Sequence, residues 1–288
     1  MRAHFSITEL CRALGVSRSG YHASLSRPEA PRSKANKQLL VHIKTVHTHR
    51  HTRSYGSPRM TQALLDQGHS CSRNRVARLM RENSIRVRPR RPFRPKTTQP
   101  DHAAHPSPNL LAKEAPATAP GQQIVSDITY IPTAEGWVYL AVVVDLFSRC
   151  VLGWKVSSSM HSDLVGHAIT RAMATGLVPK GAIFHSDRGC QYSSSQIRKL
   201  LARFGLRQSM SAKGYCYDNA FAESTFASIK NESFPPDHCF PTRKAAELAI
   251  FDYLETFYNR NRLHSSLGYQ SPQSFLNHYF QNQNQSLN

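Results

Sequence analysis

Three carboxylic acids in the second half of the chain stand in apolar surroundings. Asp127 interrupts an apolar stretch, Asp187 follows a short apolar segment, and Glu223 lies among aromatic and aliphatic residues. An ionised carboxylate in such a setting is costly unless it is paired or binds a metal ion. Each acid alone could form a salt bridge or cap a helix, but together they could hold two Mg²⁺ ions about 3.5–4 Å apart. Such a pair of ions promotes in-line displacement at phosphorus, because one activates a water or a 3′-hydroxyl and the other stabilises the leaving oxygen.

The elements that would position these acids begin near residue 122, where the hydrophobic period changes. The apolar run 137–144 is typical of a central strand buried on both faces, and Asp145 at its end is left outside the catalytic set. Three strands followed by alternating helices and strands predict an α/β class with a mixed sheet. The other expected strands are 124–131, 151–156 and 182–184, and the expected helices are 163–175, 195–204, 218–232 and 242–259.

The first 120 residues carry nearly all of the excess positive charge. They hold 22 basic and 6 acidic side chains, against 15 and 12 in residues 121–288, within a net charge of +19. This asymmetry favours a polyanionic partner, since each phosphate neutralised by Lys or Arg releases condensed counterions. A ribosome-like basic protein, or simply a soluble surface, is the alternative.

Two helical segments precede the α/β region. Residues 6–26 have the spacing of a helix-turn-helix unit, whose second helix is capped by Ser17 and begins with Arg18; a generic helical hairpin fits this spacing equally well. Residues 37–86 form a second helical block that ends in a basic amphipathic helix. The outer face of this helix carries Arg73, Arg75, Arg78 and Arg81.

Residues 89–120 contain eight prolines, which exclude both a helix and a central strand. We therefore expect a linker. Its first third, residues 88–96, is strongly basic and could follow a nucleic-acid backbone between two domains.

Cysteines and histidines give little sign of a metal site or a disulfide framework. The six cysteines include no CxxC pair and fit a reducing compartment. The set His47, His49, His51, His69 and Cys71 lacks the spacing that fixes zinc geometry, so solvated or phosphate-facing histidines are favoured. No signal segment and no apolar run of about 18 residues is present. We expect a soluble, cytoplasmic protein with no membrane partner.

The acids and their surroundings resemble a known family. Asp187 and Glu223 are separated by 35 residues and Lys230 follows Glu223 by seven, as in the D,D(35)E signature of retroviral integrases and insertion-sequence transposases. The flanking motifs are similar to those of the IS-three family, in which this chain would be the product of the second reading frame. These motifs are YGSPR at 55–59, RLMRE at 78–82, DITYI at 127–131, HSDRGCQY at 185–192, Asp218-Asn219-Ala220, and YNR at 258–260 with His264 and LGYQSP at 267–272.

The resemblance implies an RNase H-like catalytic core. It places Asp127 on the first strand, Asp187 just after the fourth and Glu223 on a later helix. These residues would be the catalytic and metal-binding set for two Mg²⁺ ions, with Mn²⁺ as a possible substitute. Seven residues make about 1.94 helical turns, so Lys230 would share a helix face with Glu223 and could touch DNA beside the metals. A solvated lysine is the alternative.

The resemblance also implies a transposase that cleaves and joins DNA strands at the ends of its own mobile element, without a covalent protein–DNA intermediate. Its partners would be double-stranded DNA of the element ends and of the target, further copies of the chain in a synaptic complex, and an upstream-frame polypeptide of the same element. The location would be the bacterial cytoplasm, at the nucleoid. Two other functions stay open: an RNase H-like nuclease that only hydrolyses, and a catalytically silent DNA-binding regulator.

We expect five segments along the chain. These are a helix-turn-helix segment (1–30), a helical DNA-binding domain (35–88), a Pro-rich basic linker (89–120), an RNase H-like integrase core (121–235) and a C-terminal helical extension (236–288). The expected DNA-binding side chains are Arg18, Arg73, Arg75 and Arg78 from the N-terminal segments and Lys230 from the core.

Overall fold

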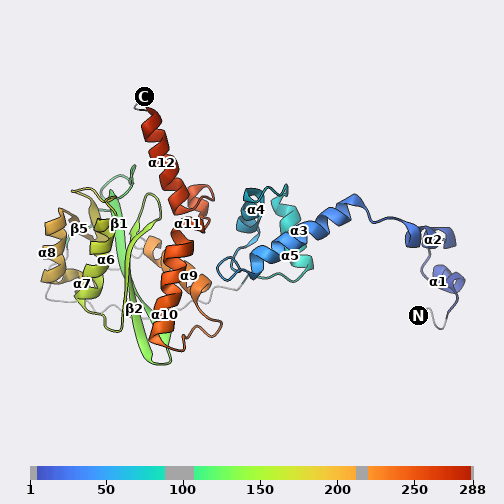
Figure 1. The fold of residues 1–288 in the computed structure, drawn as a ribbon, viewed down its shortest axis with the longest axis horizontal. Helices are drawn as coiled ribbons and strands as arrows, with labels where there is room; N and C mark the ends of the chain where they lie inside the picture. Colours follow the sequence, from blue (N-terminus) through green and yellow to red (C-terminus); the bar gives the residue numbers. More distant parts are fainter. Residues whose placement is uncertain (1–4, 88–106, 212–219, 287–288) are drawn as a thin grey trace.

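The structure is a computed structural model of the 288-residue chain, and it describes residues 5–87, 107–211 and 220–286. Within these ranges a series of helices precedes an α/β core, as Figure 1 shows. None of the helices in the described ranges has the length and apolar character needed to cross a bilayer.

The two shortest N-terminal helices form a hairpin at the end of the molecule away from the sheet (Figure 1). Helix α1 (Ile7–Ala13) starts with a capping box in which Ser6 and Glu9 bond to each other's backbone N–H groups. Helix α2 (Arg18–Ser26) starts at Ser17, whose hydroxyl accepts the N–H of Gly20. The expected helix pair is confirmed.

The next three helices pack together as one unit. They are α3 (Pro31–Thr48), α4 (Ser57–Asp66) and α5 (Arg73–Glu82). Their apolar faces meet in a common core, as expected for amphipathic helices of this length. Fully or almost fully buried in it are Leu39, Ile43, Met60, Leu64, Val76 and Leu79.

Five strands form a mixed sheet in the order β3-β2-β1-β4-β5. Strands β3, β2 and β1 are antiparallel neighbours, whereas β4 and β5 run parallel to β1. The mixed sheet is confirmed, but β5 was not predicted, because Met210 is the single apolar residue among its four. The strands are β1 (Gln123–Thr133), β2 (Gly136–Asp145), β3 (Val151–Ser157), β4 (Ile183–Ser186) and β5 (Arg207–Met210).

Helices cover both faces of the sheet. Helices α6 (Ser162–Ala174) and α8 (Ser195–Phe204) lie on one face, and α9 (Ala220–Ser233) and α10 (Arg243–Phe251) lie on the other. Along β2, Leu140 and Val142 belong to the α9 side and Ala141 and Val143 to the α6 side. This alternation confirms a central strand buried on both faces.

The close approach of α6 to β3 depends on a glycine. A Cβ atom at Gly153 would lie 2.1 Å from the carbonyl oxygen of Ala168. Only glycine therefore permits this contact between the helix and the strand.

The helix expected over 242–259 is not uniformly α-helical. After α10, a π-helical segment, η2 (Asp252–Tyr258), leads into the short helix α11 (Asn259–Asn261). Long π-helical segments are rare, and no residue pattern in this region indicates one. The wider turn accompanies the burial of four side chains against α9 and the N-terminal helices, namely Tyr253, Leu254, Phe257 and Tyr258. The chain ends in the 3₁₀ turn η3 (Ser265–Leu267) and helix α12 (Pro272–Ser286).

The described part of the expected linker lies along the sheet edge. Arg207 on β5 donates two hydrogen bonds to the Glu114 carboxylate, at 2.6 and 2.9 Å. The hydroxyl of Ser209 accepts the N–H of Leu110 at 2.9 Å. Residues 107–114 therefore contact the edge strand and shield part of its open side.

Candidate active site

Strands β1 and β4 place Asp127 and Asp187 on neighbouring parallel strands. The two strands are in register at Val125 and His185, and each aspartate comes two residues later. Both aspartates are half-buried. Asp127 lies within β1 and Asp187 directly follows β4, so the parallel register of these strands brings the two acids side by side.

Backbone groups orient both carboxylates. The Oδ1 atom of Asp127 accepts the N–H of Ile128 at 2.8 Å. The Oδ1 atom of Asp187 accepts the N–H of Gly189 at 3.0 Å, in the turn that leads into the short helix α7 (Cys190–Ser193). Each side chain is therefore fixed by its own strand or loop.

A buried tyrosine links the two segments that carry these acids. The Tyr192 hydroxyl lies 3.0 Å from the hydroxyl of Ser126, which precedes Asp127. Burial, together with the negative charges of Asp127 and Asp187, raises the pKa of the Tyr192 phenol well above its usual value. The phenol therefore stays protonated and available for hydrogen bonding. Sequence analysis did not single out this residue, although it ends the HSDRGCQY motif.

Lys230 extends from α9 toward Asp127. Burial lowers the pKa of the Lys230 ammonium, and the negative charge of Asp127 opposes that effect. The side chain is half-buried, so it does not lie on a fully solvated helix face. A cation at this position, beside the Asp127 carboxylate, is well placed to bind a phosphate group.

Glu223 is not brought together with the two aspartates. It is exposed on the first turn of α9, directly after the undescribed residues 212–219. Within the described ranges, no three His, Cys, Asp or Glu side chains are arranged to hold one metal ion. The hard oxygens of Asp127 and Asp187 fit a divalent cation, and the third expected ligand is separate from them.

Asp145 has a structural role at the end of β2. Its carboxylate is buried and accepts the N–H groups of Gly121 and Ser148, at 3.0 and 2.9 Å, as well as the Ser148 hydroxyl. Such saturation fixes the turn into β3 and leaves little capacity for a metal ion.

The expected DNA-binding arginines lie on two separate helical units. Arg18 and Arg73 are exposed at the starts of α2 and α5. Arg75 donates its Nε–H to Asn36 at 2.8 Å, which ties α5 to α3, and Arg78 lies 3.8 Å from Glu82. The structure does not bring these four arginines together with Lys230.

The C-terminal end of α9 is held by a buried ion pair. Arg262 donates from Nε and Nη2 to the two carboxylate oxygens of Glu232, at 2.8 and 2.9 Å, and the Tyr253 hydroxyl donates to the same group at 2.7 Å. His51 is also buried, with its ring nitrogens 2.9 Å from Asp252 Oδ2 and 3.3 Å from the Glu232 carbonyl oxygen. This histidine is neither solvated nor phosphate-facing, because it joins the N-terminal helices to α9.

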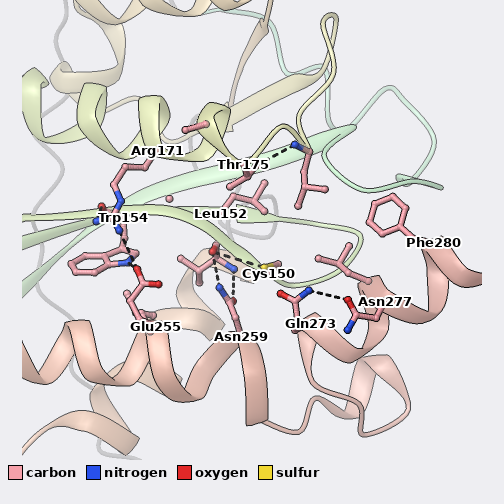
Figure 2. Close-up of a pocket in the computed structure, with 16 residues that line it drawn as sticks. Cys150, Leu152, Trp154, Arg171, Thr175, Glu255, Asn259, Gln273, Asn277 and Phe280 are labelled. Carbon is pink, nitrogen blue, oxygen red and sulfur yellow. Dashed lines mark hydrogen bonds and ion pairs between the residues drawn. The ribbon is translucent and has the colours of Figure 1, made fainter.

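One cavity lies away from the acids. It has a volume of about 500 Å³ and is bordered by edge strand β3, α6, α11 and α12 (Figure 2). Figure 2 shows Asn259 bonded to both backbone polar groups of Val151, and Glu255 bonded to the Trp154 indole. Burial raises the pKa of the Cys150 thiol to about 12, so this cavity offers no thiolate nucleophile.

Comparisons with known proteins match this architecture. The family model described as "Integrase core domain" matches residues 117–216, a second model of that description matches 204–272, and "HTH-like domain" matches 34–93. Over 279 residues the chain is 41% identical to the transposase InsF for insertion sequence IS3A of Escherichia coli (strain K12), and the match covers 96% of each chain.

The chain belongs to the IS3 family of transposases. As a DDE-type polynucleotidyl transferase, this IS3-family transposase binds DNA and catalyses strand cleavage and strand transfer at the ends of its insertion sequence. A purely hydrolytic nuclease and a silent regulator are not favoured.

Solved structures with a similar chain come from retroviruses. One is the simian T-cell lymphotropic virus intasome in complex with PP2A regulatory subunit B56 gamma, with 15% identity, a TM-score of 0.47, and coverage of 82% of this chain and 74% of that chain. Another is the HTLV-2 integrase catalytic core domain in complex with magnesium, in a trimeric form, with 17% identity, a TM-score of 0.41, and coverage of 55% of this chain and 98% of that chain.

Proposed function

We propose that this IS3-family transposase performs strand cleavage and joining with two Mg²⁺ ions held by Asp127, Asp187 and Glu223. The observation that carries the proposal is the register of β1 and β4, which aligns the two aspartates beside Lys230. Bound divalent ions would lower the pKa of the attacking hydroxyl and stabilise the leaving oxygen. Mn²⁺, which also prefers oxygen ligands, would substitute.

The chain's own residues position the reacting phosphate. The backbone bonds to Asp127 and Asp187 hold the carboxylates in fixed orientations, and the contact between Tyr192 and Ser126 links their segments. The Lys230 ammonium would bind a phosphate oxygen next to the metal ligands. Because of this positioning, both strand cleavage and strand joining would proceed as displacements between groups that are already aligned.

We further propose that the transposase acts as a multimer and with an upstream-frame polypeptide of the same element. An element has two ends, so pairing them calls for at least two copies of the chain. The unit formed by α1 and α2 buries only Cys11 among its large apolar residues and exposes Leu14, Val16 and Leu25 by 75%, 49% and 60%. A helix pair with so little core of its own calls for a further polypeptide.

The proposal is tested with purified protein, a labelled duplex carrying one element end, and unlabelled target DNA. With Mg²⁺ or Mn²⁺ we expect a nick that exposes a 3′-hydroxyl, followed by a joined product on a sequencing gel, and with chelator neither product. Nicked DNA without any joined product would favour the nuclease function instead.

Replacing Lys230 tests its contact with the phosphate. Lys230→Ala should slow joining by about tenfold or more, since charge-assisted hydrogen bonds contribute about 1.5–3 kcal/mol. Lys230→Arg should keep part of the rate, because the charge survives while the shape of the group changes. Single-turnover joining at saturating DNA measures both variants. Lys199→Ala, an exposed lysine on α8, is the control, and a Lys230→Ala rate equal to that of the control would remove Lys230 from the site.

A further inference from the structure

Two sequence motifs with no role in the acid site meet in the structure. One is YGSPR at 55–59, at the start of α4, and the other is the block 258–272 that follows η2. The buried Tyr55 hydroxyl accepts the N–H of Leu263 at 3.2 Å, across 208 positions of sequence. Figure 1 shows the unit α3–α5 beside α9 and α11, where these motifs lie. We call the region around Tyr55, Glu232 and Arg262 the junction.

The carboxylate of the junction is already engaged. Glu232 accepts three hydrogen bonds, two from Arg262 and one from Tyr253. Arg262 is therefore neutralised by a paired charge. Any other cation in the junction has to find a different partner.

Arg59 is such a cation. Its guanidinium lies 5.8 Å from the centroid of the Tyr55 ring, and it makes no hydrogen bond or ion pair with any residue that the structure describes. Burial and the nearby positive charge of Arg262 lower the pKa of Arg59, and the negative charge of Glu232 opposes them. A half-buried guanidinium that is repelled by a second one and has no direct ion pair of its own can accept an added anion.

Arg149 is a second such cation. It stacks over the Phe221 ring at 3.9 Å, and its Nη1 atom is buried with no hydrogen-bond partner among residues 5–87, 107–211 and 220–286. Its backbone has a φ of +63°, an unfavourable value for a residue other than glycine. Strain of this kind is retained most often at functional positions.

The positive charges converge on His264. Burial and the charges of Arg262, Arg59 and Arg149 lower the pKa of His264 to about 2, so this imidazole stays neutral. The helix terminus near Arg59 adds to the positive field, because α4 begins at Ser57 and its N-cap residue, Gly56, provides no side-chain cap. Uncapped N–H groups at a helix start attract anions.

We propose that the junction is a phosphate-binding site for the DNA backbone of the element end, with Arg59 and Arg149 as its ligands. The choice of DNA rests on the proposed function, since the transposase must hold DNA both on its N-terminal helices and at the Asp127 and Asp187 pair. A backbone contact at the junction joins these two surfaces. Such contacts fix register without reading sequence.

The test measures DNA binding by the full chain without metal, over a series of salt concentrations. Arg59→Gln should bind an end-carrying duplex about tenfold more weakly at moderate salt, with the slope of log K against log salt shallower by about 0.9 per lost phosphate contact. Arg59→Lys should keep the parent slope. Arg149→Gln should make the slope shallower by the same amount as Arg59→Gln does. Arg203→Gln, which removes an exposed charge on α8, is the matched control and should keep the slope.

Thermal unfolding separates binding from a structural role. Arg59→Gln should melt at the parent temperature or above, because it removes a half-buried cation that faces Arg262. A Tm several degrees lower with an unchanged salt slope would make Arg59 a structural residue and overturn the proposal. A parent Tm raised by sodium phosphate, with the same salt slope in parent and Arg59→Gln, would assign the site to a small anion and also overturn it. These experiments measure binding and unfolding, not catalysis, so a negative result here would not count against the proposed strand cleavage. Conversely, a failed cleavage assay would not change the salt slopes.

Discussion

Asp127→Asn or Asp187→Asn should each abolish strand cleavage and joining while leaving DNA binding close to the parent level. Each substitution removes one anionic ligand but no N-terminal phosphate contact. Loss of groups that merely orient a metal ligand already costs about 10–100-fold, so we expect losses above about 100-fold. Single-turnover cleavage with labelled end DNA measures the rate, and a mobility shift without metal measures binding.

Glu223→Gln is the stricter test of the proposed metal-binding set. Glu223 is exposed on α9, and in the described ranges it is not arranged with the two aspartates to hold one metal ion. A loss as large as those of the aspartate variants would support its place in the reacting complex. Asp163→Asn, which neutralises an exposed acid on α6, should retain full activity. Cleavage within tenfold of the parent would remove the residue concerned from the proposed catalytic set.

The positions of Asp127 and Asp187 could be predicted because both depend on local patterns. Asp127 interrupts an apolar strand, and Asp187 follows another, so the apolar residues around each acid predict where it lies. Parallel pairing then makes them neighbours without further information. Asp145, which was left outside the proposed catalytic set, has a carboxylate that closes a turn.

Contacts between distant segments were not predictable from one sequence. The partner of Tyr192 is Ser126, 66 positions away, and that of Glu232 is Arg262, 30 positions away. A buried glutamate and arginine look like ordinary surface residues until the fold places them together. Strand β5 and the π-helical η2 were missed for a different reason, since β5 has a single apolar residue, Met210, and a π turn has no characteristic residue pattern.

The junction also explains how α9 keeps its position on the sheet. The helix carries Lys230 beside Asp127, and two residues later Glu232 joins Arg262 in a pair that is about 3% exposed on both sides. Arg53 adds a hydrogen bond to the Phe234 carbonyl at 3.0 Å. The N-terminal helices are therefore part of the support of the catalytic helix, and not only a separate DNA-binding unit.

Arg262→Met should consequently be among the most destabilising single substitutions in the chain. It leaves the Glu232 carboxylate buried with only the Tyr253 hydroxyl as a side-chain partner, and breaking a buried pair in this way costs about 3–5 kcal/mol. At about 2–4 °C per kcal/mol for a chain of this size, the Tm should fall by about 10 °C. The double variant with Glu232→Gln should recover part of this loss, because no buried charge remains.

Arg260→Met, which replaces an exposed arginine two residues away, is the control and should stay within about 0.5 kcal/mol of the parent. Urea unfolding followed by circular dichroism measures all three, and an Arg262→Met protein as stable as Arg260→Met would show that the ion pair does not hold α9 in place.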